Sequence, residues 1–288
     1  MQTIPPYHAT RHQAMTEDAL RSAAPSVFAA ASHESRSARY TYIPTIDIVR
    51  GLSREGFLPV AASESRVRTE DKRGFAKHML RFRRAQDIEA LTHATGISRA
   101  TPSHEFPEVV LINSHDGSSA YKLMAGIFRL VCSNGLIIGD VSEECKIRHS
   151  GNILDLVTEA AFTIARDFER QLTVAAEMKQ IELDPMESLI LAEGAAEIRF
   201  DLEPGEKSPV APTEFLRARR LDDRKNDLWT TFNRVQENTI RGGLHGHDTA
   251  PDGKRRAVST REVRGIDQNV KLNRAIFALA AKMAELKR

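Results

Sequence analysis

The segment 108–139 constrains the fold most strongly, because short apolar runs alternate in it with turn residues. It reads EVVLINSHDGSSAYKLMAGIFRLVCSNGLIIG. Its β-branched start, 109–112, is typical of a buried strand. Asp116-Gly117 is a strong hairpin signal, because both residues tolerate a positive φ. A long apolar run at 121–132, a second turn at 133–135 and a last apolar run at 136–138 follow. We therefore predict a three-stranded antiparallel meander here.

Two further strands are predicted upstream, at 57–68 and 75–84, joined by a polar loop. In the second, His78 and Leu80 alternate with Lys77 and Arg81, so that one face is apolar and the other basic. The helix predicted at 152–179 carries apolar residues at helical spacing and would cover one face of the sheet. The expected fold class is α+β: an antiparallel sheet meander covered by a long helix, with a mainly helical C-terminal half.

Composition shifts along the chain suggest the domain organisation. Residues 1–40 are rich in Ala, Ser and His and lack a regular apolar period, so we expect a mobile N-terminal arm with a short helix near 16–24. Residues 41–200 form the expected α+β core domain. A proline-containing linker at 201–212 then leads to a helical C-terminal region, 213–288, packed on the core.

The overall composition is that of an ordinary globular protein and favours no particular partner. Hydrophobic residues make up 41% of the chain, and the formal net charge is only +2. Two cysteines without a secretory signal indicate a reducing, cytoplasmic location. No apolar run approaches the roughly 20 residues that span a membrane. No GxxxxGK[ST] motif occurs, which argues against a P-loop nucleotide-hydrolysing enzyme.

Positive charge is concentrated in two segments. Residues 66–84 contain eight Lys or Arg but only two acids. A ribbon with one basic face suits the DNA backbone, although solvated sheet faces also carry alternating charges. The second concentration is C-terminal, at 217–264, where acids balance the first arginines and a polar loop at 245–261 leaves Lys254, Arg255 and Arg256 freer to meet phosphate. The candidate nucleic-acid-binding residues are Arg66, Arg68, Lys72, Arg73, Lys77, Arg81, Arg83, Arg84, Lys254, Arg255 and Arg256.

Other polar groups suggest chemistry less strongly. Ser114-His115-Asp116 contains the residue types of a hydrolase triad, but adjacent turn residues point apart and a triad needs convergence. His245, His247 and Asp248 could bind a metal only weakly. The polar residues at 233–238 could line a pocket, recognise bases or stabilise the end of their own helix. We therefore expect no enzyme activity, no cofactor and no metal site.

Four segments carry a resemblance to a known family. They are NSHDGSSAYKL at 113–123, GIFRLVCSNGL at 126–136, ARRLDDRKNDLWTTFNRVQENTIRGG at 218–243 and VKLNRAIFALA at 270–280. Over residues 40–288 the chain resembles the phage/plasmid-like protein family, whose shared domain is a domain of unknown function (number 932). The resemblance implies carriage on phages, plasmids and integrative elements, and it implies no established reaction.

The order of elements also resembles, by topology only, the single-strand-annealing recombination proteins. Those proteins form oligomeric rings and hold single-stranded DNA in a basic groove. The leading hypothesis is therefore a mobile-element DNA-binding protein that binds or anneals single-stranded DNA as a homo-oligomer. The alternative is a protein-interaction factor, such as an inhibitor of a host defence system, without DNA-binding or enzyme activity.

Overall fold

The computed structural model describes residues 13–36, 42–67, 69–94, 105–129, 135–136, 145–146, 153–249 and 254–287. The chain separates into two compact units, one of Met1–Val131 with Gly139–Phe168 and one of Cys132–Ile138 with Glu169–Arg288. The division falls near residue 168 and not in the proline-containing segment 201–212. That segment lies within the second unit, where Val210 is buried and the Pro209 carbonyl accepts the His247 N–H at 2.7 Å.

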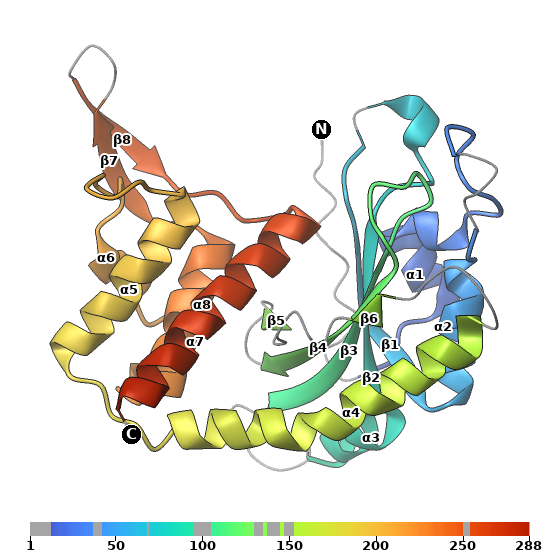
Figure 1. The fold of residues 1–288 in the computed structure, drawn as a ribbon, viewed down its shortest axis with the longest axis horizontal. Helices are drawn as coiled ribbons and strands as arrows, with labels where there is room; N and C mark the ends of the chain where they lie inside the picture. Colours follow the sequence, from blue (N-terminus) through green and yellow to red (C-terminus); the bar gives the residue numbers. More distant parts are fainter. Residues whose placement is uncertain are drawn as a thin grey trace. The chain divides into compact units, whose positions relative to one another are not determined.

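The first unit is built on an antiparallel meander (Figure 1). Its four main strands pair in chain order: β1 (Phe57–Glu64), β2 (His78–Arg84), β3 (Glu105–Asn113) and β4 (Lys122–Arg129). The short elements of this unit are a 3₁₀ helix (Glu70–Lys72), α3 (Ala85–Ala94) and β6 (Cys145–Lys146), of which β6 pairs with β4. The two-residue strand β5 (Gly135–Leu136) belongs to the second unit. The predicted α+β class and its antiparallel meander are therefore confirmed.

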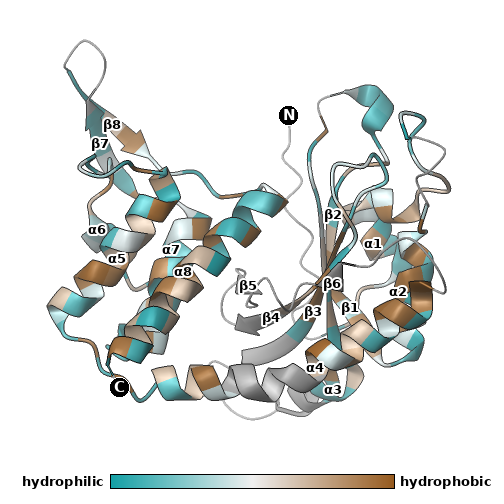
Figure 2. Cartoon of the chain, in the orientation of Figure 1, coloured by the Kyte–Doolittle hydropathy of each residue, from teal (hydrophilic) through white to brown (hydrophobic). Residues whose placement is uncertain are grey.

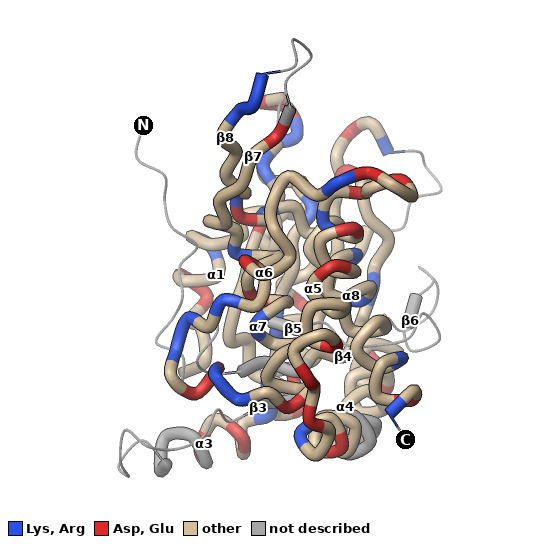
Figure 3. The backbone as a smooth tube through the Cα atoms, turned by 90° about the vertical axis from the view of Figure 1, so that its left-hand side faces the viewer, with Lys and Arg blue, Asp and Glu red and all other residues tan. Residues whose placement is uncertain are grey.

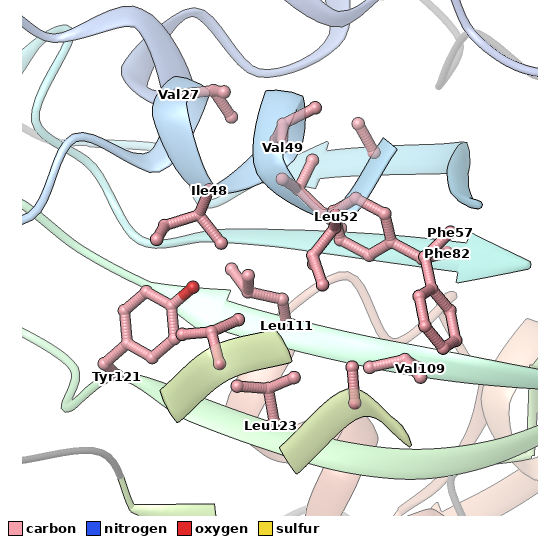
Figure 4. Packing of buried hydrophobic residues seen from close by; sticks show 14 of the residues in the cluster. Val27, Ile48, Val49, Leu52, Phe57, Phe82, Val109, Leu111, Tyr121 and Leu123 are labelled. Carbon is pink, nitrogen blue, oxygen red and sulfur yellow. The ribbon is translucent and has the colours of Figure 1, made fainter. Parts of the chain in front are cut away.

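Two helices, α2 (Thr45–Arg54) and α4 (Ile153–Met178), cover the apolar face of this sheet. Figure 4 shows Leu52 of α2 packed with Phe57, Phe82 and Leu111 of the strands. Val157, Ala161 and Ile164 of α4 belong to the same core. Burying each large apolar side chain contributes about 1.5–3 kcal/mol, so this layer is the main source of stability in the first unit.

Residues 13–36 are not the mobile arm that we expected. The helix α1 (Glu17–Ala23), capped by Thr16, and a 3₁₀ helix (Pro25–Phe28) pack into the sheet core through Leu20 and Val27. Ser26 fixes the segment, since its hydroxyl accepts the Ala76 N–H and its own N–H donates to Glu64, both at 2.8 Å. The sheet supplies apolar contacts that no local pattern reveals. Residues 1–12 and 37–40 lie outside the described residues.

The second unit is mainly helical. Its elements are α5 (Pro185–Phe200), α6 (Pro212–Phe215), a 3₁₀ helix (Asp222–Arg224), α7 (Leu228–Arg241), β7 (His245–Thr249), β8 (Arg255–Ser259) and α8 (Ile266–Leu286). Asp184 and Glu187 form a capping box at the start of α5, with both hydrogen bonds at 2.8 Å. The buried small residues Ala192, Ala195 and Ala196 allow α7 and α8 to approach α5 closely. None of the helices among the described residues is long and apolar enough to cross a membrane.

Candidate nucleic-acid interface

In the first basic segment, two of the candidate cations are bound by a buried carboxylate. Glu108 on β3 accepts a hydrogen bond from Arg81 Nε at 2.6 Å and another from Arg83 Nη2. The Glu108 side chain is fully buried, and those of Arg81 and Arg83 are only 17% and 5% exposed. Charge-assisted pairs of this kind fix both side chains. Arg81 and Arg83 therefore hold strands β2 and β3 together and are poorly placed to contact phosphate.

The remaining cations of this segment vary in exposure. Arg84 lies over the Phe57 ring at 5.8 Å, and exposed Arg73 pairs with exposed Glu70 at 2.7 Å. Lys72 and Lys77 are half-buried, whereas Arg66 is exposed. Arg68 lies outside the described residues. The structure thus leaves Arg66 and Arg73 as the most accessible of the described cations here, and it does not bring the eight together on one open face.

The second basic segment is a two-stranded ribbon and not the irregular loop that we expected. β7 and β8 pair antiparallel, with His245 opposite Ser259 and His247 opposite Ala257. Lys254, Arg255 and Arg256 stand where β8 begins, and all three are exposed. Lys and Arg cluster on β8 in Figure 3, and Figure 2 shows β7 as largely hydrophilic. The sequence signal was weak because the strands carry few β-branched residues.

Opposite residues of an antiparallel pair share a face, which assigns the two sides of this ribbon. One side presents His245, His247, Arg255 and Ala257, and all four are exposed. Arg256 is on the other side, where it pairs with Asp248 at 3.1 Å. That pair is exposed and contributes little to stability. Arg255 has no ion-pair partner among the described residues, so it is available to an anion.

Gly246 anchors the base of the β7–β8 ribbon. A Cβ at this position would lie 2.0 Å from the Pro209 carbonyl oxygen and 2.8 Å from Val210 Cα. Both obstacles are backbone atoms, which cannot rotate away. We expect Gly246→Ala to destabilise the second unit by about 1–3 kcal/mol and to loosen the ribbon. Urea unfolding followed by Trp229 fluorescence tests this expectation. Gly265→Ala is the matched control, because Gly265 has a φ of -71° and an added Cβ would come no closer than 3.8 Å to Gln268 Cβ. A stability unchanged from wild type would contradict the anchoring role.

A second polar group lies inside the first unit, around the end of β3. Thr45 Oγ1 is 3.0 Å from His78 Nε2, 3.3 Å from His115 Nε2 and 3.0 Å from Asn113 Nδ2. All four side chains are buried. His78 Nδ1 lies 3.0 Å from the Ala76 carbonyl, so we assign the ring proton to Nδ1. Thr45 can then donate to His78 and accept from the other two groups. Thr45 is the first residue of α2, whose N-cap position is Pro44.

Burial lowers the pKa of both histidines, because it disfavours the charged imidazolium. It lowers the pKa of His78 to about 3 and that of His115 to about 4. Three polar atoms here are buried and have no hydrogen-bond partner among the described residues: His115 Nδ1, Asn113 Oδ1 and the Tyr121 hydroxyl oxygen. No local pattern predicted this cluster, because its members are separated by up to 70 positions in sequence.

Ser114, His115 and Asp116 turn towards different partners. Ser114 Oγ accepts the Ser119 N–H at 2.8 Å, and Asp116 Oδ1 accepts the Ser118 N–H at 2.9 Å. Burial alone would raise the pKa of Asp116, but its hydrogen bonds with Ser118 and the charge of Lys72 hold the pKa below its usual value. These contacts organise the turn, as its Asp-Gly sequence predicts.

The polar residues of α7 are bound within the second unit. Asn233 donates to the Trp229 carbonyl at 2.7 Å, and Gln236 donates to Asn273 at 2.6 Å. Glu237 binds both Nη atoms of Arg220 at 2.7 Å. Asn238 completes the network by donating to the Phe215 and Arg217 carbonyls. These side chains hold helices and loops of the second unit together. Most of their bonds leave α7, so the alternative that they stabilise the end of their own helix does not describe them either.

The described residues contain no group of three or more His, Cys, Asp or Glu side chains that could hold a metal ion. On β7, His245 and His247 share one side of the ribbon, whereas Asp248 belongs to the other. These three side chains therefore do not converge on one point.

The fold and its surface define an α+β protein with a meander sheet, a helical unit and an exposed basic β-ribbon. A family model described as "Domain of unknown function (DUF932)" matches residues 32–277, and the chain belongs to this family. It is 42% identical over 270 residues to the UPF0380 proteins YfjQ and YafZ of Escherichia coli (strain K12). Each match covers 94% of this chain and 92% of the relative.

No solved structure matches the chain. The family membership that the sequence motifs predicted is thus confirmed. The weaker resemblance to single-strand-annealing proteins stays a prediction.

Proposed function

We propose that this protein is a non-enzymatic DNA-binding protein of mobile elements, which acts in the cytoplasm and contacts the backbone of single-stranded DNA. The observation that supports this function best is the exposed β7–β8 ribbon with Lys254, Arg255 and Arg256. Cations on a protruding ribbon can follow a phosphate backbone, and neutralised phosphates release counterions. The ribbon, and not the 66–84 segment, is therefore the main proposed contact.

The experiment that tests this proposal is fluorescence-anisotropy binding to a labelled single-stranded oligonucleotide of about 40 nucleotides, across a salt titration. We expect micromolar or tighter binding that weakens steeply with salt. Replacing Lys254, Arg255 and Arg256 by Ala should weaken binding. It should also reduce the slope of log affinity against log salt concentration by about 2, since each phosphate contact on a single strand contributes about 0.7 to that slope.

A charge-matched control replaces Lys207, Lys271 and Lys282 by Ala, which removes three exposed cations of the second unit outside the ribbon. This control should retain the affinity and the slope. Absence of binding at low salt, or equal effects of the two triple variants, would refute the assignment of the ribbon. Replacing Arg81 and Arg83 is a poor test, because it would leave buried Glu108 without its partners. Light scattering in the same buffer checks the proposed homo-oligomer.

The second candidate function is a protein-interaction factor, such as an inhibitor of a host defence system. It is favoured by Met186 and Ile190, which lie one turn apart on α5 and are 63% and 50% exposed. Large exposed apolar side chains on one helix face often mark a protein contact. This function predicts weak or absent DNA binding, so the salt titration also discriminates between the two candidates.

A further inference from the structure

A pocket of the second unit opens between the start of α5, the end of α6 and α7. Its volume is about 340 Å³, which lies within the range of small-molecule sites. Its lining residues are Leu183, Pro185, Ser188, Leu189, Thr213, Leu216, Asn226 and Arg234. Half of them are apolar and one is a cation. The pocket therefore joins an apolar wall to a single positive charge.

Arg234 is unusual because its half-buried guanidinium lacks a carboxylate within ion-pair distance among the described residues. Its Nη2 donates to Thr231 Oγ1 at 2.9 Å, whereas its buried Nε has no hydrogen-bond partner in the described part of the chain. Burial lowers the pKa of Arg234, and the charges of Asp223 and Asp227 act in the opposite direction. A half-buried guanidinium that lines a pocket and lacks a carboxylate partner favours an anion supplied from outside.

Two acids near Arg234, Asp223 and Asp227, accept hydrogen bonds from other residues. Asp223 accepts from Arg220 Nη1 at 2.7 Å. Asp227 caps α7, where its two oxygens accept from the Thr230 N–H at 2.8 Å and the Thr230 hydroxyl at 2.7 Å. These acids stabilise the positive charge of Arg234 from a distance without filling the pocket. They also limit the pocket's attraction for highly charged anions, because like charges repel.

The other polar side chains that line the pocket are also available for hydrogen bonds to a ligand. Within the described part of the chain, the side chains of Ser188, Thr213 and Asn226 have no hydrogen-bond partner. Ser188 is buried, whereas Thr213 and Asn226 are exposed. Together with Arg234 they provide hydroxyl, amide and guanidinium donors around one volume. Such a set can orient a ligand that the apolar residues hold by burial.

We propose that this pocket binds a carboxylate attached to an apolar group, with Arg234 as the carboxylate-binding residue. A planar guanidinium matches a carboxylate with two parallel hydrogen bonds. One cation near two acids suits a monoanion better than a phosphate, which carries more charge. Leu183, Leu189 and Leu216 would contact the apolar part of the ligand. The same chemistry occurs in a free branched carboxylic acid and in the C-terminus of a peptide that ends in an apolar residue.

Isothermal titration calorimetry with three probes tests this proposal on the full-length chain. The probes are isocaproate, N-acetyl-alanyl-leucine and the C-terminal amide of the same dipeptide. We expect saturable binding of one or both acids and no binding of the amide. The acid that binds more tightly identifies the source of the carboxylate. No saturable binding of either acid, or equal binding of the acid and its amide, would overturn the proposal.

Two variants locate the site. Arg234→Gln should weaken acid binding at least about ten-fold, because it removes the charge-assisted pair. Thr213→Val preserves the side-chain shape and should weaken binding about three-fold, through the loss of one hydroxyl. Arg264→Gln, at an exposed arginine paired with Glu262, is the matched control and should bind like wild type. Unchanged affinity in both pocket variants would place binding elsewhere.

Arginine-selective NMR gives a measurement that needs no variant. The Arg234 Nε–H signal should shift on addition of the acid probes and not on addition of the amide. A shift confined to other arginines would refute the role of Arg234. This outcome is independent of the DNA-binding proposal, because the salt titration with single-stranded DNA uses neither the pocket nor its probes.

Discussion

Lowering the pH from 7 to 5 will destabilise the first unit by about 4 kcal/mol through His78 and His115. Both histidines have a pKa near 6.5 when unfolded, and burial lowers these values to about 3 and about 4 in the folded state. Between these values the unfolded chain binds more protons than the folded one. The stabilising contribution is therefore complete above pH 6.5 and is lost as the pH falls, at up to about 1.4 kcal/mol per pH unit for each histidine.

The hydrogen-bond geometry explains why the folded state resists protonation. Protonated His78 would carry a second N–H directed at Thr45 Oγ1. This oxygen already accepts hydrogen bonds from Asn113 Nδ2 and His115 Nε2. A buried N–H without an acceptor is destabilising, and so is a buried charge without a counterion. Glu64 and Asp87 act in the opposite direction, because burial raises the pKa of each carboxyl.

Hydrogen exchange of the β2 and β3 amides measures this loss, because these strands carry His78 and end beside His115. Trp229, the single tryptophan of the chain, lies on α7 and reports on the second unit in the same samples. His78→Gln should reduce the pH dependence by about one proton. His247→Gln removes an exposed histidine and is the matched control. An equal pH dependence in wild type and His78→Gln would contradict the prediction.

Replacement of Glu108 by Gln should destabilise the first unit by about 3–5 kcal/mol. The variant leaves the positive charges of Arg81 and Arg83 next to a neutral amide in a site where the Glu108 side chain is fully buried. Removing one partner of a buried pair costs more than the pair contributes, because the remaining charge stays desolvated. Urea unfolding monitored by circular dichroism provides the measurement, again with Trp229 fluorescence for the second unit.

A combined variant distinguishes two causes of destabilisation: the unpaired buried charges that Glu108→Gln leaves, and the loss of packing at the same site. Changing Glu108, Arg81 and Arg83 all to Gln removes every charge of the group, so it should be less destabilising than Glu108→Gln alone. Glu70→Gln, which breaks the exposed pair with Arg73, is the matched control and should leave stability within error of wild type. A triple variant at least as unstable as the single one would show that packing, and not charge, dominates at this site.

Local signals predicted much of the fold. The Asp116-Gly117 turn, the apolar runs on either side of it and the capping box of Asp184 and Glu187 all depend on residues close in sequence. Such signals fix turns, helix starts and the alternation of strands, because the interactions involved span only a few residues. The antiparallel meander and the family membership both followed from these short segments.

The candidate sites depended on contacts that the sequence does not encode locally. The positions of Arg81 and Arg83 predicted a basic face, but Glu108, 27 and 25 residues away, accepts hydrogen bonds from both. The β7–β8 ribbon has few residues that favour strands, and it is held by Gly246 against the backbone at Pro209. The pocket at Arg234 collects side chains from three helices. None of these three arrangements could be predicted from the sequence, because each depends on residues that meet only in the folded chain.

The sequence alone determined the fold class, the main turns and helix starts, the family and the positions of the positive charges. The tertiary structure decided which of those charges are accessible, that residues 13–36 join the core and that a half-buried arginine faces a pocket. The physical reason is the range of the interactions. Periodicity and capping act within a few residues, whereas burial and ion pairing depend on side chains that meet only after folding.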